Sequence, residues 1–256
     1  MEQRTVDGVT FLVATEMERR GFLVAYSERA GGVSEPPFDT LNLGYATGDR
    51  PEHVRENRDR LVRALGIPPF AIGMQAHGSR LVRVGHARAG AGFDGPPSPL
   101  GQGDVLAVSR SLLPVAVLVA DCLPLALASP DEGLLVAVHA GWRGVAAGVI
   151  DAALAAFDRP ARIVTAVGPS IGPCHYEVGE DVARAVSAAS PAGAVTERRD
   201  GRLFLDLPAT AVGVLRAAGV RTIERADLCT GCEPERFFSY RRNGETGRQG
   251  MVGLRL

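Results

Sequence analysis

The sequence predicts an α+β fold, in which a mixed central sheet is sandwiched by helices. Short runs rich in Val, Leu and Ala recur along the chain, and several are nearly continuous, as expected of strands that are covered on both faces. Helical patterns separate some of these runs but not all, which argues against the strict alternation of a Rossmann fold or a barrel. Because no internal repeat or convincing linker divides the sequence, residues 1–256 are expected to form a single domain.

The apolar runs define the expected strands. The most apolar stretch, Leu112 to Ala120, is broken by Pro114 and ended by Asp121. It is far shorter than the segment of about 20 apolar residues that crosses a bilayer, so it is interpreted as a core strand. The expected strands are Phe22–Tyr26, Leu81–Val84, Val105–Val108, Val115–Val119, Leu123–Ala128, Leu134–Val138 and Arg162–Val167.

Segments with helical periodicity lie between some of these strands. The expected helices are Pro51–Leu65, Val145–Phe157, Gly179–Ala189 and Pro208–Ala218. The last has proline in its first turn, where backbone N–H groups have no acceptor within the helix and proline is therefore tolerated. The segment GHARAGAGFDGPPSPLGQGD, residues 85–104, is rich in Gly, Pro and Ala and is expected to be an exposed loop.

Charge and composition narrow the class of function. The chain has 28 Lys+Arg against 29 Asp+Glu, a net charge of -1, so it offers no basic field for nucleic acid or an anionic membrane. Small-molecule chemistry is therefore favoured. The first residues, MEQRTVDGVTFLVATEMERR, lack the apolar core of a signal peptide, which predicts a cytoplasmic protein with reduced cysteines.

Two soft metal ligands follow apolar runs. Cys122 comes after Val115 to Ala120 and Asp121, and His139 comes after Leu134 to Val138. If the two runs are neighbouring strands that end at one edge, these side chains lie close together. His77, in MQAHGSRLVRV, precedes another expected strand. Zinc binds thiolate and imidazole, and a site with three protein ligands leaves a fourth position for water or substrate.

The residues alone leave three interpretations of this trio open. The first is a metal site, which must be assembled by a preformed scaffold because the spacing is too wide for a zinc finger. The second is a nucleophilic Cys122 with His139 as its base. The third is ordinary burial, since free cysteines and single histidines often belong to a core.

Two further cysteine motifs are interpreted as structural. In GPSIGPCHYEVG, Cys174 and His175 are adjacent, and adjacent side chains of an extended chain point to opposite sides, so they are not expected to form one site. CTGC, residues 229–232, has the CxxC form of redox enzymes and zinc ribbons but has no second pair. It is interpreted as a surface turn with two thiols, and Cys232→Ser is expected to leave turnover near normal.

Three arginines lie beside glycine-rich or turn-forming sequence. They are Arg29 in SERAGGVS, Arg143 in GWRG and Arg241 in FFSYRRNGETGRQG. At such places a guanidinium can meet an anion. Because most arginines are solvated surface residues, the pattern makes each a candidate for substrate contact and no more.

Motifs in order along nearly the whole chain resemble the YfiH-like, or laccase-domain, family. They are SERAGGVSEPPFDTLNLGYATGD, VRENRDRL, QAHGSRLV, ADCLPLALASP, HAGWRG, GPSIGPCHYEVG, LDL, CTGC and FFSYRRNGETGRQG. The most specific are HAGWRG and ADCLP. The family is also labelled polyphenol oxidase and is regarded as a family of purine nucleoside phosphorylases. Many relatives read GPCCYEV where this chain has His175.

The resemblance implies a fold, a metal and a reaction. The implied fold is α/β/β/α-like, and the implied zinc ligands are His77, Cys122 and His139. The implied activities are phosphorolysis of adenosine, inosine and 5'-methylthioadenosine, with adenosine deamination as a second reaction. A water whose pKa is lowered by zinc suits attack at C6 of adenine. Purine nucleosides and phosphate are the expected partners, without nucleic acid or membrane.

Further roles follow as hypotheses from this chemistry. Arg29, Arg143 or Arg241 is expected to hold phosphate, and Asn42 to hydrogen-bond ribose or base. Asp121 is a candidate proton carrier or orienter of a ligand histidine. Alternatives are a copper-dependent phenol oxidase with the same ligands, a cysteine hydrolase that acts on cell-wall peptides, and a zinc-stabilised binding protein without turnover.

Overall fold

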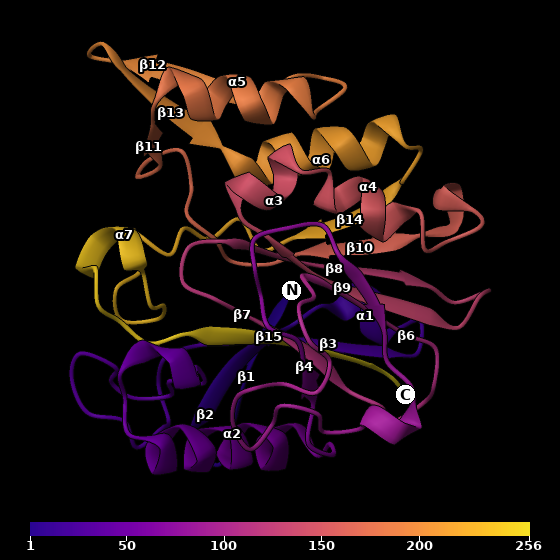
Figure 1. The fold of residues 1–256 in the computed structure, drawn as a ribbon, viewed down its shortest axis with the longest axis vertical. Coiled ribbons are helices and arrows are strands. Elements are labelled where there is room, and N and C mark those ends of the chain that lie inside the picture. Colours follow the sequence, from indigo (N-terminus) through magenta and orange to yellow (C-terminus); the bar gives the residue numbers. More distant parts are fainter.

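The computed structural model describes residues 1–256 and stacks its elements in the order helix, sheet, sheet, helix (Figure 1). The first sheet has the strand order β1 (Glu2–Val6), β2 (Val9–Val13), β3 (Phe22–Ser27), β15 (Gln249–Arg255), β7 (Val115–Val119) and β4 (Ala71–Ile72). The second has the order β14 (Thr222–Arg225), β10 (Val164–Val167), β8 (Leu123–Ser129), β9 (Leu134–Ala140), β6 (Val105–Val108) and β5 (Leu81–Arg83). Both sheets mix parallel and antiparallel pairs.

Helices cover the outer faces of the two sheets. Helix α2 (Pro51–Leu65) lies under the first sheet, and α3 (Trp142–Ala146), α4 (Val149–Leu154) and α6 (Leu207–Ala217) lie over the second. A small sheet of β11 (Glu177–Val178), β13 (Arg202–Asp206) and β12 (Val195–Arg199) lies beyond them with α5 (Glu180–Ala188). Helices α1 (Thr15–Glu18) and α7 (Tyr240–Asn243) are single turns.

The alternation of side-chain size along β8 and β9 explains the layering. The fully buried Leu123, Leu125 and Leu127 face the helix layer, whereas the small Ala126 and Ala128 between them face the other sheet. Because both faces of these strands are buried, the runs are continuously apolar. The predicted α+β class and the α/β/β/α layering are confirmed.

The predicted helix Val145–Phe157 is wrong as a single element. The chain forms α3, then Gly148 adopts the left-handed conformation with φ 77°, and α4 begins at Val149. Glycine takes this conformation without steric cost, which lets the chain turn sharply between the helices. The other predicted helices agree with α2, α5 and α6 to within one residue at each end.

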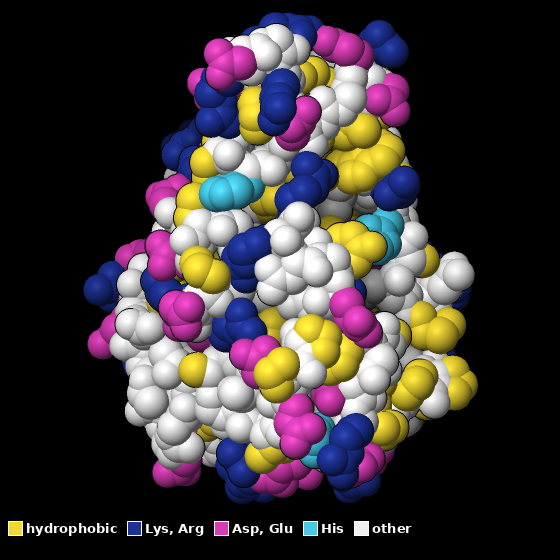
Figure 2. Space-filling model, turned by 90° about the vertical axis from the view of Figure 1, so that its left-hand side faces the viewer, with side chains coloured by type: hydrophobic (Ala, Val, Ile, Leu, Met, Phe, Trp, Pro, Cys, Tyr) yellow, Lys and Arg dark blue, Asp and Glu magenta, His cyan; other side chains and the backbone are white.

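Two general features of the chain bear on its partners. None of its helices combines the length and the apolar character that crossing a membrane requires. Figure 2 shows basic and acidic side chains intermingled over the face that it presents, in agreement with the near-zero net charge. Neither feature identifies a substrate, so the prediction of small-molecule chemistry depends on whether the structure contains a suitable cavity.

The central position of β8 gives a test of this architecture. Leu125 is fully buried and pairs with Val138 of β9 and Val167 of β10. We expect Leu125→Ala to lower the free energy of unfolding by about 2–5 kcal/mol, because it leaves a cavity in a covered strand. The matched control is Leu112→Ala, at a side chain that is 61% exposed. Equal effects of the two substitutions on urea denaturation would contradict the layer assignment.

Candidate metal and substrate site

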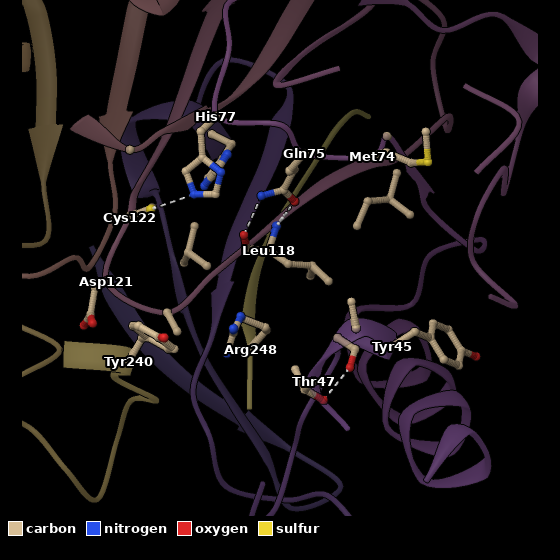
Figure 3. A pocket seen from close by; sticks show the side chains of 18 of the residues that line it. Tyr45, Thr47, Met74, Gln75, His77, Leu118, Asp121, Cys122, Tyr240 and Arg248 are labelled. Atoms are coloured by element: carbon tan, nitrogen blue, oxygen red, sulfur yellow. Dashed lines mark hydrogen bonds between the residues drawn. The ribbon is translucent and has the colours of Figure 1, made fainter. Parts of the chain in front are cut away.

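Three side chains from separate segments, two of them loops and one the end of strand β9, meet at one place. Cys122 Sγ lies 3.8 Å from His77 Nε2, and the rings of His77 and His139 are edge to face with centroids 4.7 Å apart. The three candidate ligand atoms all lie within 4.8 Å of one another. Figure 3 shows His77 and Cys122 on one side of a cavity, with Arg248 across from them. Sulfur and imidazole nitrogen at these separations fit a divalent ion such as zinc.

Strand register, rather than the end of neighbouring strands, brings Cys122 to His139. In the antiparallel pair of β8 and β9, Leu123 is opposite Ala140 and Pro124 is opposite His139. Cys122 therefore immediately precedes β8, beside the end of β9. The run before Cys122 is β7, which belongs to the other sheet. The expectation that the preceding run neighbours the His139 strand was wrong, because the chain changes sheets at Asp121 and Cys122.

A buried carboxylate bonds two of the three segments that carry the candidate ligands. Asp104 accepts hydrogen bonds from the backbone N–H groups of Ala76, His77 and Gly78, at 3.1, 2.9 and 3.0 Å. His77 itself is held in the left-handed region with φ 57°. Such backbone strain persists only where surrounding contacts fix it, and it is concentrated at functional sites. Here the amide bonds to Asp104 supply that constraint.

The same carboxylate orients the buried histidine. Asp104 Oδ1 lies 2.8 Å from His139 Nδ1, so the Nε2 atom of His139 is the one left for a ligand. Carboxylate–histidine pairs of this kind fix the ring and raise its basicity at metal sites. Burial lowers the pKa of His139, but the bonds to Asp104 and Cys122 outweigh it and raise this pKa to about 9.

The pKa of the Cys122 thiol is lowered by its neighbours. Burial by itself raises the pKa of Cys122, yet the hydrogen bonds from His139 and His77 outweigh burial and lower this pKa to about 6. Metals bind the thiolate rather than the thiol. At neutral pH the chain therefore offers a charged sulfur ligand.

Asp121 has a different position from the one expected of an orienter. It lines the cavity, but its carboxylate accepts from the Thr230 hydroxyl and from the Arg241 backbone N–H, both at 2.6 Å. The carboxylate that bonds a candidate ligand histidine is Asp104. Asp121 has φ 90°, and its contacts fix the loop that carries Cys122.

The trio lies in a cavity of about 730 Å³. This volume falls in the range of small-molecule sites, which measure roughly 300–1,000 Å³. Aromatic side chains at its wall include Tyr45, Trp142, Tyr176 and Tyr240. Gly92, Pro96 and Ser98 from residues 85–104 also line it, so this segment is part of the wall and not only an exposed loop.

The candidate substrate residues divide into two groups. Arg143 and Arg241 line the cavity, and the Arg143 guanidinium lies over the Trp142 ring with a centroid distance of 4.4 Å. Arg29 and Asn42 do not line it. Arg29 donates to Asp39 and to the Pro234 carbonyl.

Asn42 is a buried scaffold residue. Its side chain bonds Asp49 and the hydroxyl of Thr47, and its Oδ1 accepts from the backbone of Gly44 and Arg248. Gly44, Thr47 and Arg248 all line the cavity. Asn42 therefore shapes the wall from behind and does not itself face a substrate.

Sequence reasoning missed several residues of the site. Asp104 is a lone acid immediately before the apolar run VLAV, and this placement was its only signal. Arg248 lies in the same motif as Arg241 and lines the cavity, where burial lowers its pKa. Arg58 also reaches the wall, although its neighbours in α2 gave no indication of that.

The expectation that Cys174 and His175 point to opposite sides and do not form one site was wrong, whereas the CTGC pair does lie in a surface turn. Cys174, His175, Cys229 and Cys232 form a second cluster whose candidate ligand atoms lie within 4.8 Å of one another. The chain is not extended at residues 174 and 175. The amides of His175 and Tyr176 both donate to the Gly172 carbonyl at 3.0 Å, and this turn brings adjacent side chains to the same side.

Comparison with known proteins identifies the family. Residues 23–255 match the model of the multi-copper polyphenol oxidoreductase laccase family. The chain belongs to this family. The purine nucleoside phosphorylase YfiH of Escherichia coli is 37% identical over 237 residues, which cover 90% of this chain and 92% of that protein. A purine nucleoside phosphorylase of Deinococcus radiodurans is 41% identical over 238 residues, 90% of this chain and 88% of that one.

Solved structures of family members share the whole fold. YlmD from Geobacillus stearothermophilus superposes with a TM-score of 0.92 at 31% identity, covering 99% of this chain and 98% of that chain. YfiH from Bacillus licheniformis superposes with a TM-score of 0.90 at 28% identity and 99% coverage of both chains. The layered architecture is therefore that of the family.

Removing the charge of Asp104 tests its role in the site. We expect Asp104→Asn to weaken zinc binding about 10–100-fold, because the amide cannot hold His139 as the carboxylate does. In metal-free protein the pKa of His139 should fall below its value of about 9, since burial then dominates. Competition with a chelator measures the first effect and NMR titration the second.

The matched control is Asp94→Asn, at an exposed acid outside the cluster. This variant should leave both quantities unchanged. Zinc binding by Asp104→Asn equal to that of the unmodified chain would show that Asp104 does not position the ligands.

Proposed function

We propose that this chain is a zinc-dependent purine nucleoside phosphorylase. In this proposal it acts on adenosine, inosine and 5'-methylthioadenosine, and it deaminates adenosine as a second reaction. The observation that carries the proposal is the His77, Cys122 and His139 cluster at the wall of a cavity that also holds arginine and aromatic side chains. The names of the relatives support the phosphorylase activity.

His77, Cys122 and His139 would hold the metal ion. When bound, zinc supplies a Lewis acid that polarises substrate oxygens and lowers the pKa of water. Copper accepts the same donor atoms and is the alternative metal. With a proton on Nδ1 facing Asp104, His139 would offer its Nε2 to the metal.

Phosphorolysis also needs an anion site. The bond from ribose C1' to purine N9 breaks as a phosphate oxygen bonds to C1', the electron pair goes to the purine, and N9 takes up a proton. Arg143 is exposed at the cavity and has no hydrogen-bond partner on its guanidinium, so this group is available for phosphate. Arg241 and Arg248 each donate from one nitrogen to backbone carbonyls and keep other donors for an anion.

The aromatic wall suits the base. Trp142 and Tyr240 lie at the cavity with exposed ring surface, and a purine gains affinity by stacking on such rings. Asp121 fixes the Arg241 amide and the Thr230 hydroxyl, which makes it a positioning residue in this proposal. Arg29 and Asn42 have the same scaffold role.

The cluster is the first test. We expect His77→Ala and Cys122→Ser to bind zinc more weakly and to lose phosphorolysis and deamination together, because one cluster serves both reactions. The assay incubates each protein with adenosine, with and without phosphate, and separates adenine, inosine and hypoxanthine by chromatography. Loss of one activity with the other at its original rate would refute a shared site. Full zinc and full activity in Cys122→Ser would refute the ligand assignment.

Two further measurements separate the alternative functions. A cysteine hydrolase would form a covalent adduct on Cys122 in metal-free, active protein. A phenol oxidase would require copper and oxygen for turnover. Neither outcome is compatible with phosphate-dependent release of adenine by the zinc-loaded chain.

Arg143 provides the second test. We expect Arg143→Gln to lower kcat/KM for phosphorolysis by about 10-fold or more, the loss of a charge-assisted bond worth about 1.5–3 kcal/mol. Deamination should change less, because water attack needs no phosphate. Arg110→Gln, at an exposed arginine outside the cavity, is the control. A parallel loss of both activities in Arg143→Gln would contradict the assignment to phosphate.

A further inference from the structure

The second cluster joins two distant segments at the surface. Cys174 and His175 lie in the loop before β11, and Cys229 and Cys232 lie in the CTGC turn after β14. Cys229 is half-buried and the other three side chains are exposed. None of the four lines the cavity of the His77 trio, so the cluster is a separate place in the fold.

The nitrogen–sulfur separations within the cluster match a tetrahedral metal site. His175 Nδ1 lies 3.4 Å from Cys174 Sγ, 3.7 Å from Cys229 Sγ and 3.5 Å from Cys232 Sγ. Zn–S and Zn–N bonds of about 2.3 and 2.05 Å in tetrahedral geometry give a sulfur–nitrogen separation of about 3.6 Å. The imidazole nitrogen therefore faces all the sulfurs at the spacing of ligands around one zinc ion.

The backbone is shaped to hold these side chains together. The amides of Cys232 and Glu233 both donate to the Cys229 carbonyl, which forms the tight turn that a CxxC pair of ligands needs. A Cβ atom at Gly231 would lie 2.7 Å from His175 Cγ, so the imidazole packs against a position that only glycine leaves open. The two segments also pair through a parallel bridge between Ser170 and Cys229.

A backbone hydrogen bond favours a thiolate at Cys229, and two guanidinium groups are bonded to the backbone beside the cluster. The Gly172 N–H donates to Cys229 Sγ at 3.2 Å. The Arg242 guanidinium donates to the carbonyls of Thr230 and Gly231, and Arg199 donates to the Pro173 carbonyl. Three thiolates with a neutral imidazole and Zn²⁺ carry a net charge of -1, which these two guanidinium groups offset.

We propose that Cys174, His175, Cys229 and Cys232 form a second, structural zinc site. All four tetrahedral positions are filled by protein ligands, which is typical of structural sites and leaves no position for a substrate. The three thiols lose their protons as the metal binds. The proposal is independent of the activity at the first cluster.

The site has a mechanical connection to the catalytic cavity. Thr230, between the two cysteines of the turn, donates its hydroxyl to Asp121, and the Asp121 carbonyl accepts from Ile171. Both ligand-bearing segments are thus bonded to the residue before Cys122. Zinc at the second site would fix the two loops that hold Asp121 in its left-handed conformation.

Metal counting tests the proposal. Proteins are purified under reducing conditions from zinc-supplemented cells, and zinc per chain is measured by mass spectrometry. We expect two zinc ions in the unmodified chain, one in His77→Ala/Cys122→Ser, and one in Cys229→Ser/Cys232→Ser. Removal of the remaining zinc from His77→Ala/Cys122→Ser by a chelator should lower its Tm.

Cobalt spectroscopy identifies the ligands without Cys229→Ser/Cys232→Ser, a variant that loses its structural zinc and can fail to fold. Co²⁺ bound to His77→Ala/Cys122→Ser should give the intense near-ultraviolet band of a tetrahedral site with three thiolates. In that background His175→Cys should keep the metal and gain the intensity of a fourth thiolate. His175→Ala should bind it about 10-fold or more weakly, as expected on loss of a ligand.

Three outcomes would overturn the proposal. One is the absence of zinc from His77→Ala/Cys122→Ser, in which only the second cluster is intact. Another is cobalt binding to His77→Ala/Cys122→Ser without a thiolate band. The last is a Cys174–Cys232 disulfide that persists under the reducing conditions, since the two sulfurs lie 3.3 Å apart and would then be unavailable for metal.

Discussion

The candidate active site depends on one buried carboxylate. Asp104 bonds the imidazole of His139 and the backbone of the loop that carries His77, while its own carbonyl accepts from the His139 amide at 2.8 Å. A charge at a side chain that is only 1% exposed is tolerated because every lone pair has a donor. Two of the three candidate ligands are thus fixed relative to β6 and β9 by a single residue.

The third ligand is fixed by a different set of contacts. Cys122 lies where the chain leaves the first sheet and enters the second, and Asp121 makes this crossing in a strained conformation. Bonds from Thr230 and Arg241 hold that conformation. The CTGC turn, and with it the proposed structural zinc, therefore supports the same loop from outside. The second cluster therefore stabilises the loop that carries Cys122, and Cys122 belongs to the first cluster at the cavity wall.

Buried strands could be predicted because both their faces are covered. β7, β8 and β9 consist almost entirely of Val, Leu and Ala, and their positions agree with the expected runs. Exposed strands gave no such signal: β1 and β12 are mostly solvent-exposed and polar. β15 is central but contains Gly250 and Gly253, where an added Cβ atom would lie about 3 Å from Leu43 and Leu135. Because this close packing requires glycine at both positions, the segment lacks the β-branched and apolar residues that usually indicate a strand.

The sequence by itself determined the α+β class and the three motifs that carry His77, Cys122 and His139, because apolar patterning and ligand chemistry are local properties. Only the tertiary structure decided that Asp104 rather than Asp121 orients a histidine, and that Arg143 faces the cavity while Arg29 is held by Asp39. Only it joined Cys174 and His175 to the CTGC turn. These decisions rest on strand register, on the crossing between sheets and on turn geometry, which bring together residues too far apart in sequence for any local pattern to relate them.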